Sequence, residues 1–166
     1  MLLTIFLAIV FCTAITLMMF AAVAFIQNEK FFSSAPKEAQ AVLHHRDEEL
    51  FYGARTIGWT LMIFSMLMIL GVGIISIWDG FRSGFTFWQF FLRFVLIFTI
   101  YKLYDMICFD YFLLIRSRFF QFFYPEIEGV FPPKKYGFNI KSQLLKLLVI
   151  FPAASALSAW ICTLFQ

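Results

Sequence analysis

Charged residues are scarce in this sequence, at 14% of its 166 residues. Soluble proteins carry roughly 25% charged residues. A soluble domain of this size could not bury all of the 62% of residues that are hydrophobic here. The strands of a transmembrane barrel would alternate in character over about ten residues, and the long apolar runs exclude that pattern. The composition therefore indicates an α-helical membrane protein.

Cysteine, histidine and catalytic motifs are also scarce. Cys12, Cys108 and Cys162 lie in three different apolar runs, and without a CxxC pair they exclude zinc-ribbon and thioredoxin-like sites. The sequence has no P-loop, GxSxG, HExxH or dinucleotide fingerprint. It offers no complete catalytic set, so we expect no cofactor. The basic residues follow a membrane-topology pattern, so we expect no nucleic-acid partner.

Four apolar runs are each long enough to cross a hydrocarbon core of ~30 Å, which takes about 20 helical residues. They cover residues 2–26, 56–78, 87–115 and 144–165. The Gly-rich turn at 79–86 makes the second and third spans antiparallel neighbours. We predict a single transmembrane domain over residues 1–166, which is all-α and forms a polytopic four-helix bundle. Pro152 is expected to kink the fourth span.

The first loop holds five of the ten acidic residues. Within it, residues 38–51 carry apolar side chains partly on one helical face, and Ser33 or Ser34 could cap such a helix. We therefore predict an interfacial amphipathic helix in this loop. Small residues in the second and fourth spans favour close contacts between helices, within this chain or with a partner.

Topology follows from the basic residues. Ten of them lie in or beside the first and third loops: Lys30, Lys37, Arg46, Arg55, Arg116, Arg118, Lys134, Lys135, Lys141 and Lys146. Arg82 and Arg93 are nearer the opposite side. The positive-inside rule then places loops 27–55 and 116–143 in the cytoplasm and both termini outside, in a multi-pass cell-membrane protein.

The third span carries Lys102, Asp105 and Asp110 within an apolar run. On an α-helix, which turns by about 100° per residue, Lys102 lies between the two carboxylates and Arg93 lies on the opposite face. Intramembrane charges persist when they are paired, hydrated or used. Two interpretations stay open: a polar face that binds a ligand or ion or passes protons, and an ion pair that fixes the helix in the bundle.

Metal-type ligands at helical spacing occur in the first loop, where His44 lies three and four residues before Asp47 and Glu48. Glu126 and Glu128 are predicted on the same side of the membrane. Catalytic zinc takes three protein ligands, and structural sites use more His or Cys. We therefore predict no metal site here, and local acid–base pairing on a solvated helix face is the alternative.

The stretch from Asp110 to Lys146 resembles a family of uncharacterised short four-span membrane proteins of Gram-positive bacteria. The matching residues are Asp110-Tyr111, Pro125 with Glu128-Gly129, and Tyr136-Gly137-Phe138. Asn139 stands where the family pattern has His. The resemblance implies a protein of the bacterial inner membrane and brings no known activity. It suggests that Asp110 and Glu128 meet at the cytoplasmic mouth, with Tyr136 and Asn139 nearby, as a site for a ligand or partner.

These observations predict an integral membrane protein that acts as a non-enzymatic partner subunit or small binding and transport module. It would work as a homo-oligomer or a subunit of a membrane complex, in contact with membrane lipid. The basic, aromatic run from Arg116 to Tyr124 either anchors the helix at the headgroups or contacts anionic lipid. One alternative is a membrane enzyme acting on lipid or isoprenoid, with Asp110, Glu128 and His44 or His45 holding a metal. Another is a proton-coupled exporter that uses Lys102 and Asp105.

Overall fold

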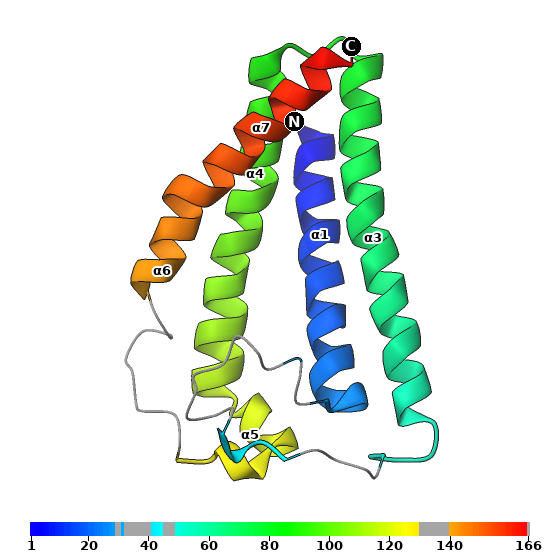
Figure 1. The fold of residues 1–166 in the computed structure, drawn as a ribbon, viewed down its shortest axis with the longest axis vertical. Helices are drawn as coiled ribbons and strands as arrows, with labels where there is room; N and C mark the ends of the chain where they lie inside the picture. Colours follow the sequence, from blue (N-terminus) through cyan, green and yellow to red (C-terminus); the bar gives the residue numbers. More distant parts are fainter. Residues whose placement is uncertain (29–30, 32–40, 45–48, 130–139, 166) are drawn as a thin grey trace.

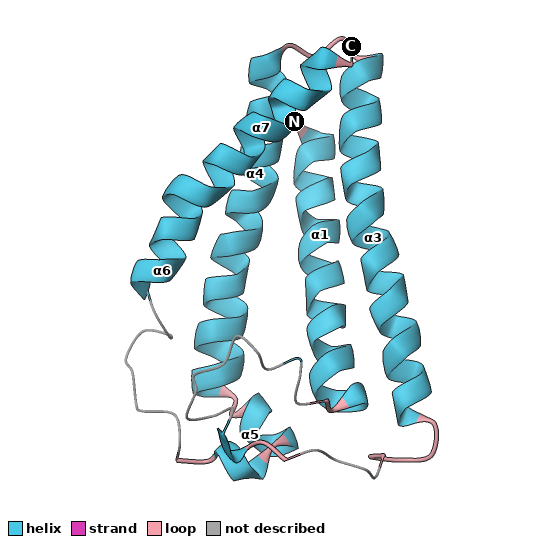
Figure 2. Ribbon diagram, in the orientation of Figure 1, coloured by secondary structure: helices cyan, strands magenta, loops and turns pink. Residues whose placement is uncertain are grey.

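The computed structural model describes residues 1–28, 31, 41–44, 49–129 and 140–165. Every long element among them is a helix (Figure 2), so the all-α prediction is confirmed for these residues. The elements are α1 (Leu2–Phe20), η1 (Ala21–Ile26), α3 (Ala54–Arg82), α4 (Phe87–Tyr104), η3 (Asp105–Arg116), α5 (Phe119–Phe123), η4 (Pro125–Ile127), α6 (Ile140–Leu145), η5 (Lys146–Ile150) and α7 (Phe151–Leu164).

Three helical segments are long and apolar enough to cross a membrane: Leu2–Ile26, Ala54–Arg82 and Ser142–Leu164. These correspond to the first, second and fourth predicted spans. The predicted third span is helical from Phe87 to Arg116, but it carries four charged residues before Arg116 and so stands apart in composition. Three candidate spans are therefore established, which is consistent with a multi-pass membrane protein, and the crossing by α4 and η3 stays a prediction.

The long helices lie side by side in the order α3, α1, α4 and α7 (Figure 1). Helix α1 packs between α3 and α4, and α7 packs on the other side of α4. This order is an open row, so the predicted closed four-helix bundle is not confirmed. Both termini lie at one end of the row, and the first and third loops leave from the other end, which we call the foot (Figure 1).

Glycine permits the closest helix contacts in this row. A Cβ on Gly58 would lie 2.7 Å from the Ile26 side chain, and a Cβ on Gly80 would lie 2.2 Å from the Phe90 ring. The Phe90 side chain of α4, which lies against Gly80 of α3, is completely buried. The small residues of the second span therefore do bring helices together within the chain at these two positions.

Two long helices change from α to π geometry toward the foot, and a third π segment lies between α6 and α7. At the ends of the two long helices the backbone bonds run over five residues, from Gln27 N to Ala22 O at 3.0 Å and from Ser117 N to Phe112 O at 2.8 Å. The third π segment, η5, comes directly before Pro152, in the first turn of α7. A wider turn there accommodates a proline ring that would otherwise meet the preceding carbonyl.

The foot is closed by a small hydrophobic cluster of Val23, Leu43, Tyr124 and Ile127. Rings of α5 and side chains of the first loop pack against it. Of the predicted interfacial helix at 38–51, residues 41–42 are helical, whereas 38–40 and 45–48 lie outside the described residues. That helix is not confirmed, although Leu43 does cover the end of α1.

Candidate functional site

Lys102 and Asp105 form a buried ion pair at the junction of α4 and η3. The Lys102 ammonium donates a hydrogen bond to Oδ2 of Asp105. The Lys102 side chain is 5% exposed and that of Asp105 is 17% exposed. The predicted i,i+3 pairing is therefore present. Each group neutralises the other inside the row of helices, which lowers the cost of burying either charge.

A polar contact between helices lies next to this pair. The Thr16 hydroxyl donates to Cys12 O at 2.8 Å and accepts from the Tyr104 hydroxyl at 2.9 Å. Tyr104 belongs to α4 and Thr16 to α1, so the bond joins the two helices. It also keeps the phenol hydroxyl satisfied where the surroundings are otherwise apolar.

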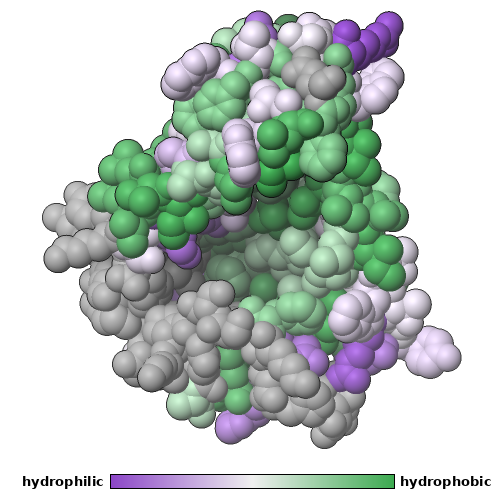
Figure 3. Space-filling view, turned by 45° about the horizontal axis from the view of Figure 1, so that its top comes forward, coloured by the Kyte–Doolittle hydropathy of each residue, from purple (hydrophilic) through white to green (hydrophobic). Residues whose placement is uncertain are grey.

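Aromatic side chains join three helices just above the ion pair. The Phe11 ring of α1 meets Phe98 and Tyr101 of α4 edge-on, at centroid distances of 6.3 and 5.2 Å. Phe98 in turn stacks on Phe151 of α7 at 5.5 Å. All four rings are partly exposed. Figure 3 shows one face of the molecule hollowed, with hydrophobic residues inside the hollow.

The predicted site at the mouth of the bundle is only partly described. Glu128 is 68% exposed and lies 3.7 Å from an Arg118 nitrogen, at the foot. Tyr136 and Asn139 lie outside the described residues, as do Asp47 and Glu48. His44 is described and exposed. No group of three metal-type side chains occurs among the residues that the structure describes.

The predicted position of Asp110 uses the 100° step of an α-helix, but the chain is a π-helix from Asp105 to Arg116. Backbone hydrogen bonds in a π-helix run over five residues, so the backbone of Asp110 lies about one turn after that of Asp105. The arrangement of Lys102 between the two carboxylates stays a prediction.

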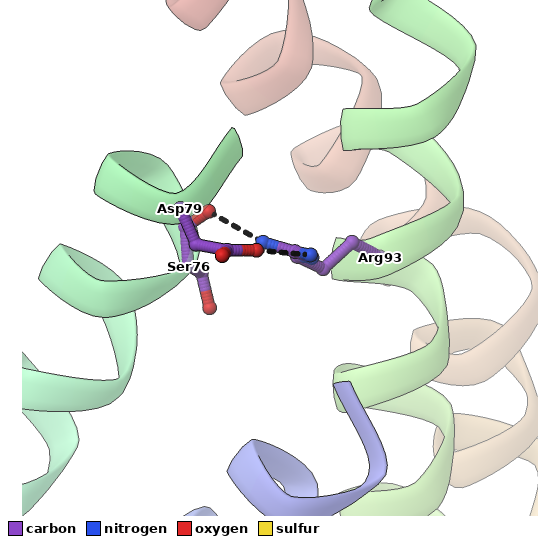
Figure 4. Close-up of polar contacts among 3 residues, drawn as sticks. All are labelled: Ser76, Asp79 and Arg93. Carbon is purple, nitrogen blue, oxygen red and sulfur yellow. Dashed lines mark hydrogen bonds and ion pairs between the residues drawn. The ribbon is translucent and has the colours of Figure 1, made fainter. Parts of the chain in front are cut away.

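A second buried ion pair lies at the opposite end of α4, and sequence reasoning missed it. Arg93 donates from Nη1 to Ser76 O at 2.9 Å and from Nη2 to Asp79 Oδ2 at 2.7 Å, as Figure 4 shows. The Arg93 side chain is 5% exposed and that of Asp79 is 27% exposed. The sequence places Arg93 on the helix face opposite Lys102 and Asp79 in the turn at 79–86. The short turn between α3 and α4 is the sequence feature that could have predicted this pair, because it brings together residues a few positions before and after it.

Phe85 completes this second cluster. Its ring lies 4.3 Å from the Arg93 guanidinium carbon, a cation–π contact. The Arg93 Nε and the Ser76 hydroxyl are buried and have no hydrogen-bond partner among the described residues. With Phe90 packed against Gly80 beside it, the cluster fixes the α3–α4 hairpin at the end opposite the foot.

Both cations of α4 are therefore paired with a carboxylate, Arg93 with Asp79 and Lys102 with Asp105. Comparison with protein-family models, with curated proteins and with solved structures finds no match. The class therefore rests on the chain itself: an all-helical protein with three helices able to cross a membrane.

Proposed function

We propose that this protein is a multi-pass integral membrane protein that acts as a non-enzymatic partner subunit, with its foot in the cytoplasm. The side assignment is supported by exposed or partly exposed cations at the foot, namely Arg55, Arg116 and Arg118. At the other end, Arg93 is buried and paired with Asp79, so Arg82 is the exposed cation there among the described residues. Positive charge thus favours the foot as the cytoplasmic side.

The observation that carries the proposal is how little of each span the chain itself covers. In the most apolar 18-residue window of the three candidate spans, 28%, 22% and 17% of residues are buried. Helix α3 is the clearest case, because it buries one narrow stripe against its neighbours and exposes large side chains elsewhere, including Leu67, Ile74 and Trp78. These surfaces meet lipid or another helix.

Two glycines in α3 favour the packing of a partner's helix against it. Gly58 and Gly80 are used for close packing inside the chain, but a Cβ on Gly71 or Gly73 would meet no atom within 4 Å. Glycine in a helix costs about 1 kcal/mol relative to alanine, and no contact within the described residues accounts for it here. Gly71 stands one turn from Leu67 and Ile75 on an exposed face, where a partner's helix could approach the backbone closely.

The mass of the purified particle tests whether the chain associates with another membrane protein or with copies of itself. The full chain, purified in mild detergent or in nanodiscs, is expected to run as a particle heavier than the 19.4 kDa chain, either as a homo-oligomer or with a co-isolated membrane protein. Gly71 and Gly73 lie about 200° apart around the helix, so Gly71→Leu tests the face that carries Leu67 and Ile75 and Gly73→Leu tests the opposite face. One of the two substitutions should reduce that mass, because it fills the contact face. Thr60→Leu is the matched control, since Thr60 is exposed on the same helix and bonds only its own turn. A wild-type particle of one chain and nothing else would refute the proposal.

Proton-coupled transport is a second candidate, and the Lys102–Asp105 pair favours it. The pair is buried, it stands where α4 changes to π geometry, and π turns recur at functional sites. Asp105→Asn would remove the titrating carboxylate. pH-dependent flux in proteoliposomes that survives this substitution would eliminate the transport candidate without touching the association proposal.

A further inference from the structure

A basic, aromatic surface forms where the α4–η3 helix ends at the foot. Arg116 closes η3, and Arg118 takes a left-handed conformation with φ of 50°. This turn sends α5 across the end of the row (Figure 1). Both arginine side chains are exposed, that of Arg118 by 76%. We call Arg116, Arg118 and Phe122 the exit surface.

Helix α5 has two different sides. Phe119, Phe120 and Phe123 pack on the hydrophobic cluster of the foot, and Phe119 also meets Phe20 of α1 at 4.9 Å. Phe122, in contrast, is 80% exposed. The segment that follows is firmly held, because Tyr124 and Ile127 are each only 1% exposed. The exit surface therefore lies on a packed base, and its exposed ring, Phe122, follows Arg118 by one helical turn.

The charge of the exit surface is only weakly offset within the described residues. Arg118 faces Glu128 across 3.7 Å, which exceeds a hydrogen bond, and both groups are largely exposed. Water and salt screen an exposed pair of this kind, so it adds little. Arg116, two residues earlier, adds a second cation. At the opposite end Arg82 lies over the Trp78 ring instead, as a single cation with an aromatic partner.

We propose that the exit surface binds the headgroup of an anionic phospholipid in the surrounding bilayer. Guanidinium groups present a fork of donors that matches phosphate oxygens. Phe122 would lie against the glycerol and upper acyl region, where aromatic rings anchor membrane helices. The lipid is favoured as the occupant by charge complementarity and by the position of the surface at the end of a predicted span. This inference stands independently of the association through α3.

The test uses the full chain in detergent micelles that contain equal amounts of phosphatidylglycerol and phosphatidylcholine. Native mass spectrometry then counts the lipids that each variant retains. The wild-type chain should prefer phosphatidylglycerol, and the preference should fall about fivefold for each arginine lost in R116Q/R118Q. R116K/R118K should keep part of it, because the charge remains and the fork is lost. R82Q is the matched control and should leave the preference unchanged.

Several results would overturn the inference. Equal retention of both lipids by the wild-type chain would do so, as would an undiminished preference in R116Q/R118Q or an equal fall in R82Q. Complete competition by excess inorganic phosphate would assign the surface to free anions instead of lipid. If R116Q/R118Q fails to elute as a monodisperse particle, R116Q alone against R82Q decides the question by the same criteria.

Discussion

The buried pair of Lys102 and Asp105 predicts an asymmetric response to mutation. Asp105→Leu leaves an ammonium whose side chain is 5% exposed, whereas Lys102→Met leaves a carboxylate that is 17% exposed. Removing one partner of a buried pair costs about 3–5 kcal/mol, because the other charge stays buried without compensation. We expect Asp105→Leu to lie at the upper end of that range and Lys102→Met at the lower end.

The double variant K102M/D105L separates pairing from charge burial. With both charges gone, the free energy of unfolding should return to within about 1–2 kcal/mol of wild type, or exceed it, because apolar replacements of buried pairs are often neutral or stabilising. The assay is reversible unfolding in mixed micelles, followed by tryptophan fluorescence, with Arg82→Gln as an exposed control. Single substitutions that each cost under 0.5 kcal/mol, or costs that simply add in the double variant, would refute the buried pairing.

Three further predictions follow from other contacts. Gly80→Ala should destabilise the fold by about 1–3 kcal/mol, because its Cβ would meet the buried Phe90 ring. Gly71→Ala in the same helix should be neutral or stabilising, because its Cβ would meet no atom within 4 Å. Equal effects of the two substitutions in the same unfolding assay would contradict this packing. Arg93→Lys should lose about 1–3 kcal/mol, since one ammonium cannot replace donation from two nitrogens to Ser76 O and Asp79, and a silent substitution would argue against the bidentate contact. Tyr104→Phe should cost about 1 kcal/mol through the lost bond to Thr16, and a Thr16→Val background should abolish that cost.

Much of the fold follows from hydropathy alone. The apolar runs at 2–26 and 56–78 predict α1 with η1 and the body of α3, and the structure extends the latter to Ala54–Arg82. Hydropathy cannot give the order of the helices, because lipid and protein offer nearly the same apolar surroundings to a side chain. The open row of α3, α1, α4 and α7 is decided by shape instead, at contacts such as Gly58 of α3 against Ile26 at the end of the first helix.

The candidate site was predictable only where its partners are close in sequence. Lys102 and Asp105 share one helix, so their pairing follows from the i,i+3 spacing. Arg93 and Asp79 lie on two helices, and their contact depends on the exact length of α3, which runs on to Arg82. The α-helical step used for Asp110 does not hold for a related reason, since nothing in the neighbouring sequence marks the change from α to π geometry at Asp105.

The proposed multi-pass topology depends most directly on whether the charged helix formed by α4 and η3 crosses the membrane. Ser83 and Ser117 bracket this helix and are both exposed, at opposite ends of the row. In a background with Cys12, Cys108 and Cys162 replaced by alanine, S83C and S117C can be labelled separately in intact cells with a membrane-impermeant maleimide. We predict that S83C is labelled from outside and that S117C is labelled only after permeabilisation. Equal labelling of both positions from one side would show that α4 and η3 do not cross, and would contradict the four-span account.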